Sequence, residues 1–363
     1  MKIVIHGYYG FGNFGDDLLC KVSIEFCRNF FNDPEIYILT YAPKPGYIDE
    51  LTEGPITLIN ETRRVNADVL LVGGGGLFFD FDKGSTLDLL LNIVLKRIPP
   101  KMYFGLMQRA GKTFRATKKI GVGIGVGKFT RSSPKYRYKL LQLLQFDHIY
   151  LRDRISHENL AKAARLNARQ TTDLAFASSY WVPENLPPSQ EKRVLFILRD
   201  WKWNDSSNLE NAFLWMDSLL SLGYECDVAS FDPIHDKVLF KKCTEQNVNF
   251  ISWDPSRMSF NDYVRQLNQY DIFVSSRAHG ILSGLILGKK CLSVVLEPKL
   301  DEIRNMASGS IGSISPEASP EEFTEIFHTY INSFNREVQQ KEIRSNEELI
   351  RVTLDEIADF INS

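Results

Sequence analysis

The sequence has little cysteine, and none of it is paired in a recognisable motif. It contains no CxxC pair, and its five cysteines are widely separated: Cys20, Cys27, Cys226, Cys243 and Cys291. An odd number of scattered thiols argues against a disulfide framework and indicates a reducing compartment. The histidines show no spacing typical of a zinc or iron site. We therefore expect no metal and no resident cofactor.

A strong charge bias and a membrane-spanning run are also lacking. The formal net charge is -2, and no stretch is strongly basic. This argues against nucleic acid as the main partner. The longest apolar region, Leu87 to Leu95, is interrupted by Asp88 and Asn92 and is too short to cross a bilayer. The beginning, MKIVIHGYYG, has no signal-peptide pattern. We expect a cytoplasmic protein.

What the sequence does have is an alternation of β-rich runs with amphipathic stretches. With 363 residues, 44% hydrophobic and 24% charged, it is long enough for two well-packed domains. The alternation is typical of parallel sheets covered by helices. It breaks at Trp181–Arg193, which holds three prolines and has no apolar period. We expect an α/β fold with two Rossmann-like domains facing each other across a cleft, over residues 1–182 and 190–335. Residues 336–363 should form a helix packed at the domain junction.

The expected elements follow this pattern in both halves. Strands are predicted at Lys2–His6, Ile36–Tyr41, Ile56–Ile59, Val69–Val72, Lys119–Gly123, Ile149–Leu151, Val194–Leu198, Cys226–Phe231, Phe250–Trp253, Ile272–Ser275 and Cys291–Leu296. Helices are predicted at Asp16–Phe31, Leu87–Arg97, Lys135–Leu144, Ser156–Arg165 and Asn208–Leu222. Ligands of open parallel sheets bind at the carboxyl ends of the strands, so the loops that follow these strands are the places to search.

The segment Gly7–Asp17 (GYYGFGNFGDD) directly follows the first strand. Its glycines allow tight turns, but their spacing does not match the GxGxxG dinucleotide motif. Asn13, Asp16 and Asp17 have side chains suited to hydrogen-bonding a sugar hydroxyl. The alternative is a simple strand-to-helix turn in which Asp16 caps the helix.

Two further loops combine unusual composition with a position at a strand end. The run that includes Gly74, Gly75 and Gly76 loses much backbone entropy on folding, which suggests a close approach to its backbone or else a bare turn. Arg199, at the end of Val194–Leu198, offers a planar guanidinium for a carboxylate or phosphate in the cleft. Trp201 and Trp203 could form a wall for a sugar ring. The alternative for Arg199 is a structural ion pair.

The segment Val274–Lys290 carries the strongest signal. The strand Ile272–Ser275 delivers Arg277 and His279 into a loop, and we expect a helix to start near Gly280. If the segment stays extended, Arg277 and His279 point the same way. An arginine beside a histidine suits anion binding combined with acid–base chemistry near neutral pH. A purely structural histidine is the alternative.

Taken together, these segments resemble the polysaccharide pyruvyl transferase family. The resemblance runs from Gly7 to about Lys299, and no single motif is specific, but their order and spacing are. The segments that carry it are GYYGFGNFGDD, ADVLLVGGGGLF, GVGIGVG, YLRDRIS, TTDLAF, ILRDW, SSRAHGILSGLILGKK and EPK. The sequence departs from the family at Ala278, Asp17 and Val126, where leucine, glutamate and proline are common. None of these changes removes a reactive group.

The resemblance implies two Rossmann-like domains in the GT-B-like architecture of two-domain glycosyltransferases. It also implies transfer of a pyruvyl group from phosphoenolpyruvate, an anionic three-carbon donor, to two sugar hydroxyls as a cyclic ketal. Arg199, Arg277 and His279 match the family's donor-site residues. On this basis Ser276 and Lys299 are expected to assist donor binding. Arg277 and His279 are expected to be catalytic, with His279 as acid–base residue or phosphate ligand.

Acceptor binding is assigned to Asn13, Asp16, Asp17, Gly74, Gly75 and Gly76. The acceptor could be a polysaccharide or a lipid-linked oligosaccharide of capsule, exopolysaccharide or cell-wall synthesis, and a lipid-linked one would bring the protein to the inner face of the membrane. Two alternatives stay open. One is a GT-B-type glycosyltransferase with a nucleotide-sugar donor, and the other is a non-catalytic sugar-binding protein. The oligomeric state and the position of the ketal are not specified by the sequence.

Overall fold

The computed structural model divides the chain into two compact units. Unit 1 comprises Met1–Tyr9, Leu19–Leu174 and Leu349–Ser363, and unit 2 comprises Gly10–Leu18 and Ala175–Glu348. The structure describes residues 1–42, 45–60, 65–75, 78, 115–127, 134–163, 168–199, 208–296 and 298–363. The predicted helix Leu87–Arg97 and the residues Gly76, Trp201, Trp203 and Glu297 lie outside these ranges.

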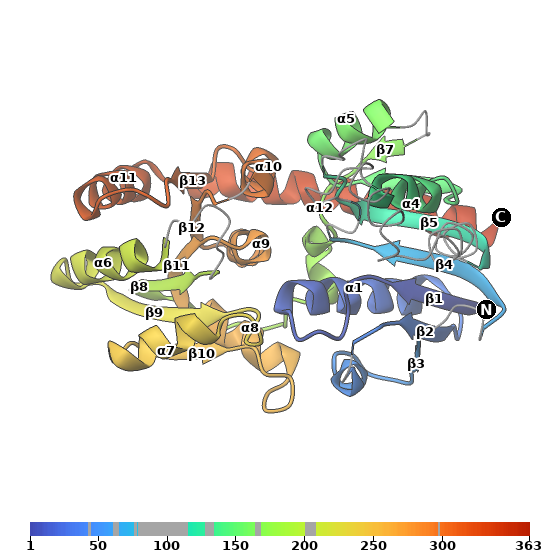
Figure 1. The fold of residues 1–363 in the computed structure, drawn as a ribbon, viewed down its shortest axis with the longest axis horizontal. Helices are drawn as coiled ribbons and strands as arrows, with labels where there is room; N and C mark the ends of the chain where they lie inside the picture. Colours follow the sequence, from blue (N-terminus) through green and yellow to red (C-terminus); the bar gives the residue numbers. More distant parts are fainter. Residues whose placement is uncertain are drawn as a thin grey trace, which may run out of the picture. The chain divides into compact units, whose positions relative to one another are not determined.

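Unit 1 is built on a seven-stranded parallel sheet. The strand order is β3-β2-β1-β4-β5-β6-β7, as Figure 1 shows from bottom to top. The strands are β1 (Lys2–His6), β2 (Glu35–Leu39), β3 (Thr57–Ile59), β4 (Ala67–Gly73), β5 (Ala116–Ile124), β6 (His148–Leu151) and β7 (Ala168–Gln170). The helices are α1 (Phe14–Phe30), α4 (Pro134–Leu143) and α5 (Arg154–Ala163), with short 3-10 turns η1 (Gly46–Glu50) and η3 (Leu174–Phe176). Val4, Leu70 and Val72 alternate with residues on the opposite face of the sheet and lie in one apolar core.

Unit 2 is built on a six-stranded parallel sheet in the order β10-β9-β8-β11-β12-β13. The strands are β8 (Gln190–Ile197), β9 (Glu225–Ser230), β10 (Phe250–Ser252), β11 (Tyr270–Ser275), β12 (Lys290–Val294) and β13 (Ile311–Ile314). The helices are α6 (Asn208–Ser221), α7 (Lys237–Glu245), α8 (Phe260–Asn268), α9 (Ala278–Ile286), α10 (Pro298–Met306), α11 (Pro320–Ser333) and α12 (Arg336–Asn362), with the turn η4 (Ser178–Tyr180). In its core the ring of Trp215 stacks on Phe323 at 4.7 Å.

The unit boundaries differ from the predicted domain boundaries in two places. Gly10–Leu18, which includes the start of α1, belongs to unit 2 although it lies near the beginning of the chain. The chain also enters unit 2 at Ala175, before the proline-rich stretch. The reason is visible at Trp181, which is buried and donates its indole N–H to the Ala175 carbonyl at 2.7 Å. The predicted last helix is present as α12, whose residues up to Glu348 group with unit 2 and the rest with unit 1.

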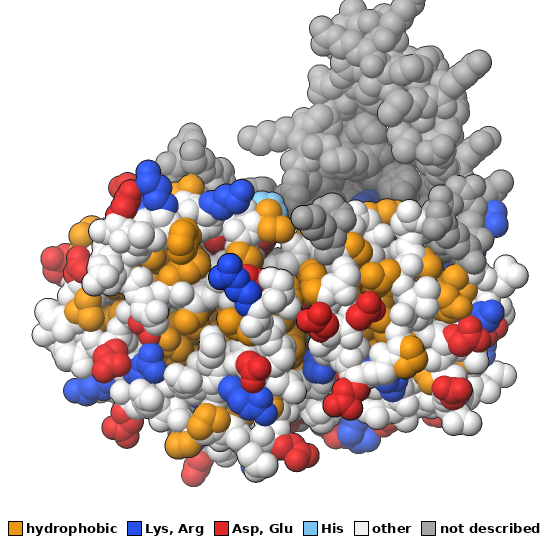
Figure 2. Space-filling view, turned by 90° about the horizontal axis from the view of Figure 1, so that it is seen from below, with side chains coloured by type: hydrophobic (Ala, Val, Ile, Leu, Met, Phe, Trp, Pro, Cys, Tyr) orange, Lys and Arg blue, Asp and Glu red, His pale blue; other side chains and the backbone are white. Residues whose placement is uncertain are grey.

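One face of the molecule carries both signs of charge. On the face drawn in Figure 2, basic and acidic side chains alternate with hydrophobic ones. Within the described ranges, no helix has the length and apolar character needed to span a membrane.

Candidate active site

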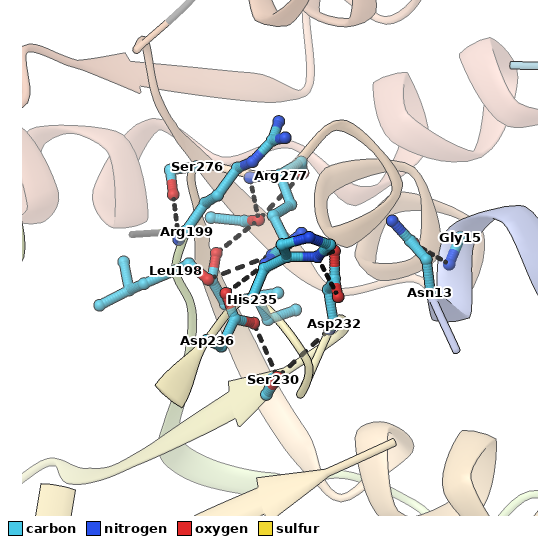
Figure 3. A network of polar contacts seen from close by, with 12 residues as sticks. Asn13, Gly15, Leu198, Arg199, Ser230, Asp232, His235, Asp236, Ser276 and Arg277 are labelled. Atoms are coloured by element: carbon cyan, nitrogen blue, oxygen red, sulfur yellow. Dashed lines mark hydrogen bonds and ion pairs between the residues drawn. The ribbon is translucent and has the colours of Figure 1, made fainter. Parts of the chain in front are cut away.

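Three neighbouring strands of unit 2 end in polar loops that contact one another. Strands β9, β8 and β11 are adjacent, and the strand order reverses between β8 and β11. Such a reversal is where open α/β sheets bind ligands. Arg199 follows β8, Asp232–Asp236 follow β9, and Ser276 and Arg277 follow β11. Figure 3 shows Arg277, Asp236, Ser230 and Asp232 joined in one polar network, with Ser276 bonded to the Arg199 backbone beside it.

Arg277 is the centre of this network. It is only 7% exposed, and its Nε donates to the Leu198 carbonyl at 3.2 Å. Its Nη2 forms an ion pair with Oδ1 of the buried Asp236. The other oxygen of Asp236 accepts a hydrogen bond from Ser230 Oγ at 2.7 Å. The guanidinium is therefore fixed in orientation by partners from two strands.

The protonation of Asp236 is set by two opposing effects. Burial is the largest effect and raises the pKa of the Asp236 carboxyl above its usual value, although the neighbouring Arg277 and the Ser230 hydrogen bond oppose it. Tyr263, which is fully buried, has a pKa raised well above its usual value, chiefly by burial, and its hydroxyl donates to the Ser230 carbonyl at 2.9 Å. A neutral phenol and a buried carboxyl group are thus both bonded to Ser230.

Two serines align the loops that carry the arginines. Ser276 Oγ accepts a hydrogen bond from the Arg199 backbone N–H at 2.9 Å. Ser275 Oγ accepts one from the Arg277 backbone N–H at 3.0 Å. The predicted donor residue Ser276 therefore bonds to the Arg199 backbone, as Figure 3 shows, and links the ends of β8 and β11.

Arg277 and His279 do not share the one extended segment that the sequence predicted. Helix α9 begins at Ala278, earlier than the predicted start near Gly280. Arg277 is extended, with φ -113 and ψ 133, whereas His279 lies in the first turn of the helix. The expectation that the segment stays extended, so that both side chains point the same way, is wrong. The two residues are nevertheless both nearly buried, with His279 only 8% exposed.

His279 packs directly against the start of α1. A Cβ atom placed on Gly15 would lie 2.2 Å from Nδ1 of His279, far inside van der Waals contact. Glycine at this position is therefore required for the imidazole to sit where it does. The glycine-rich segment in the sequence indicated a close approach to its backbone, but it did not indicate that His279 is the side chain that approaches Gly15.

The start of α1 is anchored in unit 2 by aromatic packing and two hydrogen bonds. The Phe14 ring contacts Phe231 at 4.7 Å and Tyr263 at 4.9 Å, and its backbone N–H donates to the Phe231 carbonyl at 2.8 Å. The buried Asp17 accepts a hydrogen bond from the indole N–H of Trp253 at 2.8 Å. These contacts hold the α1 start beside His279.

The predicted acceptor residues are divided between the two units. Asn13 Oδ1 accepts from the Gly15 N–H at 3.0 Å, so Asn13, and not Asp16, caps helix α1. Asp16 lies in the first turn and is half-buried, and Asp17 is occupied by Trp253. Gly74 and Gly75 belong to unit 1, with φ of 64° and 78°.

At Gly74, a neighbouring protein side chain leaves no room for a Cβ atom. A Cβ atom on Gly74 would lie 2.6 Å from Leu19 Cδ1. The close approach that the sequence indicated is thus made, at Gly74, by a side chain of unit 1 itself. Lys299 lies in the first turn of α10, which follows β12, the neighbour of β11 in the sheet.

The loop after β9 holds residues that the sequence reasoning did not assign to the site. Asp232 and Asp236 are buried there, next to the buried Ser230 at the end of β9, and His235 is bonded to Asp232. The signal was a histidine and two carboxylates in FDPIHD directly after a predicted strand. Among the described residues, no group of three or more His, Cys, Asp or Glu side chains is arranged to hold a metal ion.

A family model supplies the identity that this geometry suggests. The model described as polysaccharide pyruvyl transferase matches residues 13–297, which include Arg199, Arg277 and His279. The chain belongs to the polysaccharide pyruvyl transferase family. The resemblance noted from the motifs is thereby confirmed. A search of curated proteins finds no match.

Solved structures similar to this member of the family share its two-domain fold. The UDP-GlcNAc 2-epimerase of Methanocaldococcus jannaschii, in complex with UDP-GlcNAc and UDP, has a TM-score of 0.57 at 11% identity, over 95% of this chain and 99% of its own. The Neisseria meningitidis enzyme bound to UDP-GlcNAc has 0.57 at 14%, over 98% and 100%. Spinosyn rhamnosyltransferase SpnG, complexed with thymidine diphosphate, has 0.52 at 12%, over 97% and 99%. The predicted α/β fold of two Rossmann-like domains with GT-B-like architecture is confirmed.

Proposed function

We propose that this polysaccharide pyruvyl transferase uses phosphoenolpyruvate as donor and forms a cyclic ketal on two hydroxyls of a sugar. The donor carries a carboxylate and a phosphate, so it needs at least two cationic groups. The observation that carries the proposal is the juxtaposition of Arg277 and Arg199 on adjacent strand ends. Ser276 links their backbones at the point where strand order reverses.

Each residue of the site then has a task in the reaction. Arg277 and Arg199 bind the two anionic groups, and Lys299 adds positive charge. Protonation of the donor's methylene carbon C3 gives an oxocarbenium-like centre at C2, which the first sugar hydroxyl attacks. The second hydroxyl attacks C2, and the C2–O bond to phosphate breaks with its electron pair leaving on phosphate. His279 is assigned to delivering a proton or binding the phosphate.

The acceptor side is assigned to Asn13 and Asp16 and to the backbone of the loop that includes Gly74, Gly75 and Gly76. Asp17 is better suited to holding α1, since its carboxylate accepts the Trp253 hydrogen bond. A polysaccharide intermediate or its lipid-linked precursor is the substrate class. If the acceptor is the lipid-linked precursor, the protein works at the inner face of the membrane. No metal or resident cofactor takes part in this route.

The experiment is a phosphate-release assay with phosphoenolpyruvate and a panel of methyl hexosides and lipid-linked sugars. Thermal shift with phosphoenolpyruvate and, separately, with UDP-GlcNAc tests the donor, because a ligand that binds the folded state raises its melting temperature. We expect phosphoenolpyruvate to raise the melting temperature and UDP-GlcNAc to leave it unchanged. A shift with UDP-GlcNAc only, with no phosphate release from phosphoenolpyruvate, would identify a nucleotide-sugar glycosyltransferase instead.

A further inference from the structure

A second histidine lies at the edge of the same network. His235 is in the loop between β9 and α7, and its Nδ1 is 2.9 Å from both Oδ1 and Oδ2 of Asp232. An ionised carboxylate can only accept hydrogen bonds, so this contact favours the tautomer in which Nδ1–H donates a hydrogen bond to Asp232. In the neutral form of that tautomer, the lone pair lies on the other ring nitrogen, Nε2.

His235 and Asp232 differ strongly in solvent exposure. The Asp232 side chain is only 11% exposed, whereas that of His235 is 67% exposed. The carboxylate is therefore fixed in the protein, and the imidazole projects toward solvent. An orienting carboxylate behind a histidine is the arrangement in which a general base is held in one tautomer.

The pair is joined to Arg277 through two residues, Ser230 and Asp236. The Asp232 backbone N–H donates to Ser230 Oγ at 3.2 Å, and the same Oγ donates to Asp236 at 2.7 Å. Asp236 is the ion-pair partner of Arg277. Within one turn of chain, the backbone N–H groups of His235 and Asp236 also donate to the Asp232 carbonyl, at 3.0 Å and 2.9 Å. Figure 3 shows His235, Asp232, Asp236 and Arg277 within this single cluster.

The proposed reaction needs four proton transfers, on both the donor and the acceptor, and a single buried histidine is poorly placed to carry out all of them. In the first half, a sugar O–H bond breaks, an O–C2 bond forms and C3 gains a proton. In the second half, another O–H bond breaks, a second O–C2 bond forms and the departing phosphate gains a proton. Two protons thus leave hydroxyls, and two are delivered to C3 and phosphate. A sugar polymer arrives from solvent, so an exposed imidazole is the group that its hydroxyls can reach.

We propose that His235 is a further catalytic residue, the general base that takes the protons of the acceptor hydroxyls through Nε2, and that Asp232 is its positioning residue. This assignment rests on the proposed phosphoenolpyruvate-dependent function. His279, nearly buried against Gly15, then serves the donor side, and His235 serves the acceptor side. Nothing in the sequence motif SRAHG indicates this division.

The test compares His235→Ala, His235→Gln and Asp232→Asn with the wild type in the phosphate-release assay, with phosphoenolpyruvate and the same hexoside panel. Loss of a general base lowers turnover by roughly 10²- to 10⁴-fold. We expect such a loss in both His235 variants, with the thermal shift by phosphoenolpyruvate unchanged. Asp232→Asn should lower kcat at least about tenfold at unchanged KM for phosphoenolpyruvate. His157→Gln, a change at an exposed histidine of unit 1, is the matched control and should be active.

Added imidazole gives a readout that a structural role would not move. Because His235 is exposed, free imidazole can reach the space left in His235→Ala and should restore part of the turnover. Wild-type turnover in His235→Gln, or loss of the phosphoenolpyruvate shift in parallel with turnover, would overturn the assignment of His235 alone. A wild-type protein that neither binds phosphoenolpyruvate nor releases phosphate would overturn the proposed function and this inference together.

Discussion

Each unit of the molecule buries one arginine of a family motif, and the two are used differently. In unit 1, Arg152 of YLRDRIS is 4% exposed and contacts two buried carboxylates, Asp153 at 3.1 Å and Asp173 at 3.3 Å. In unit 2, Arg277 contacts one carboxylate, Asp236, and one backbone carbonyl. Both arginines lie within two residues of a strand end, and both lie in a segment that carries the family resemblance.

The difference between them lies in charge balance. Arg152 forms ion pairs with two carboxylates, so its positive charge is fully neutralised within the protein and is not available to bind an anionic ligand. The Arg277 charge is met by a single carboxylate, and its hydrogen bonds within the described part of the chain engage Nε and Nη2 but not Nη1. Position in a family motif therefore does not by itself separate a supporting arginine from a binding one, whereas the number of carboxylates around each arginine differs between the two.

The largest effect is expected at Arg277. Arg277→Met should lower phosphate release from phosphoenolpyruvate by about 10²- to 10³-fold, because a preorganised cation that faces the donor is lost. Since this leaves Asp236 buried without its partner, the double variant Arg277→Met/Asp236→Asn is the folded control and should be just as inactive. Near-normal turnover in the double variant would place the donor elsewhere.

Arg152 should show the opposite profile. Arg152→Met leaves two buried carboxylates without a counter-charge, so we expect a loss of about 3–5 kcal/mol in the free energy of unfolding. Urea denaturation measures this. Turnover per folded molecule should be close to that of the wild type. A stable variant with lost turnover would mean that Arg152, too, binds a substrate.

Gly15 tests the contact between the α1 start and His279. Gly15→Ala places a methyl group within 2.2 Å of His279 Nδ1, so the imidazole has to move. We expect a cost of about 1–3 kcal/mol together with reduced turnover. Gly46→Ala is the control, because no heavy atom lies within 4 Å of the added Cβ. Equal behaviour of the two variants would show that His279 is not held by this contact.

The smallest effect is expected at Trp253. Trp253→Phe keeps the aromatic packing but removes the donor to the buried Asp17, which should cost about 1–2 kcal/mol. Thermal or urea denaturation measures the loss. The double variant Trp253→Phe/Asp17→Asn should lose little more than Trp253→Phe alone, and additive losses would indicate that the two side chains act independently.

The parts of the fold that depend on local pattern could be predicted from the sequence. The predicted strand Ile272–Ser275 is the end of β11, and the predicted helix Asp16–Phe31 is α1 within two residues. Short outer strands such as β7 and β13 were missed, because three or four residues carry too little pattern. The start of α9 was placed too late, since its N-cap, Arg277, is not a residue type that marks a cap.

What the sequence could not supply is contact between distant segments. The grouping of Gly10–Leu18 with unit 2 depends on Phe14 packing against Phe231 and Tyr263, more than 200 positions away. The ion pair of Arg277 with Asp236 likewise joins two loops that only the strand order brings together. The roles of Asp232 and His235 follow from that geometry and not from any local motif.

The central claim is that the cluster around Arg277 uses phosphoenolpyruvate to build a ketal. Mass spectrometry of a hexoside acceptor, incubated with the protein and phosphoenolpyruvate, tests it most directly. We expect an acceptor heavier by one pyruvate minus one water, formed together with one phosphate, and no such product with Arg277→Met/Asp236→Asn. An acceptor that gains a sugar residue from a nucleotide sugar, such as N-acetylglucosamine from UDP-GlcNAc, and never a pyruvyl group, would contradict it.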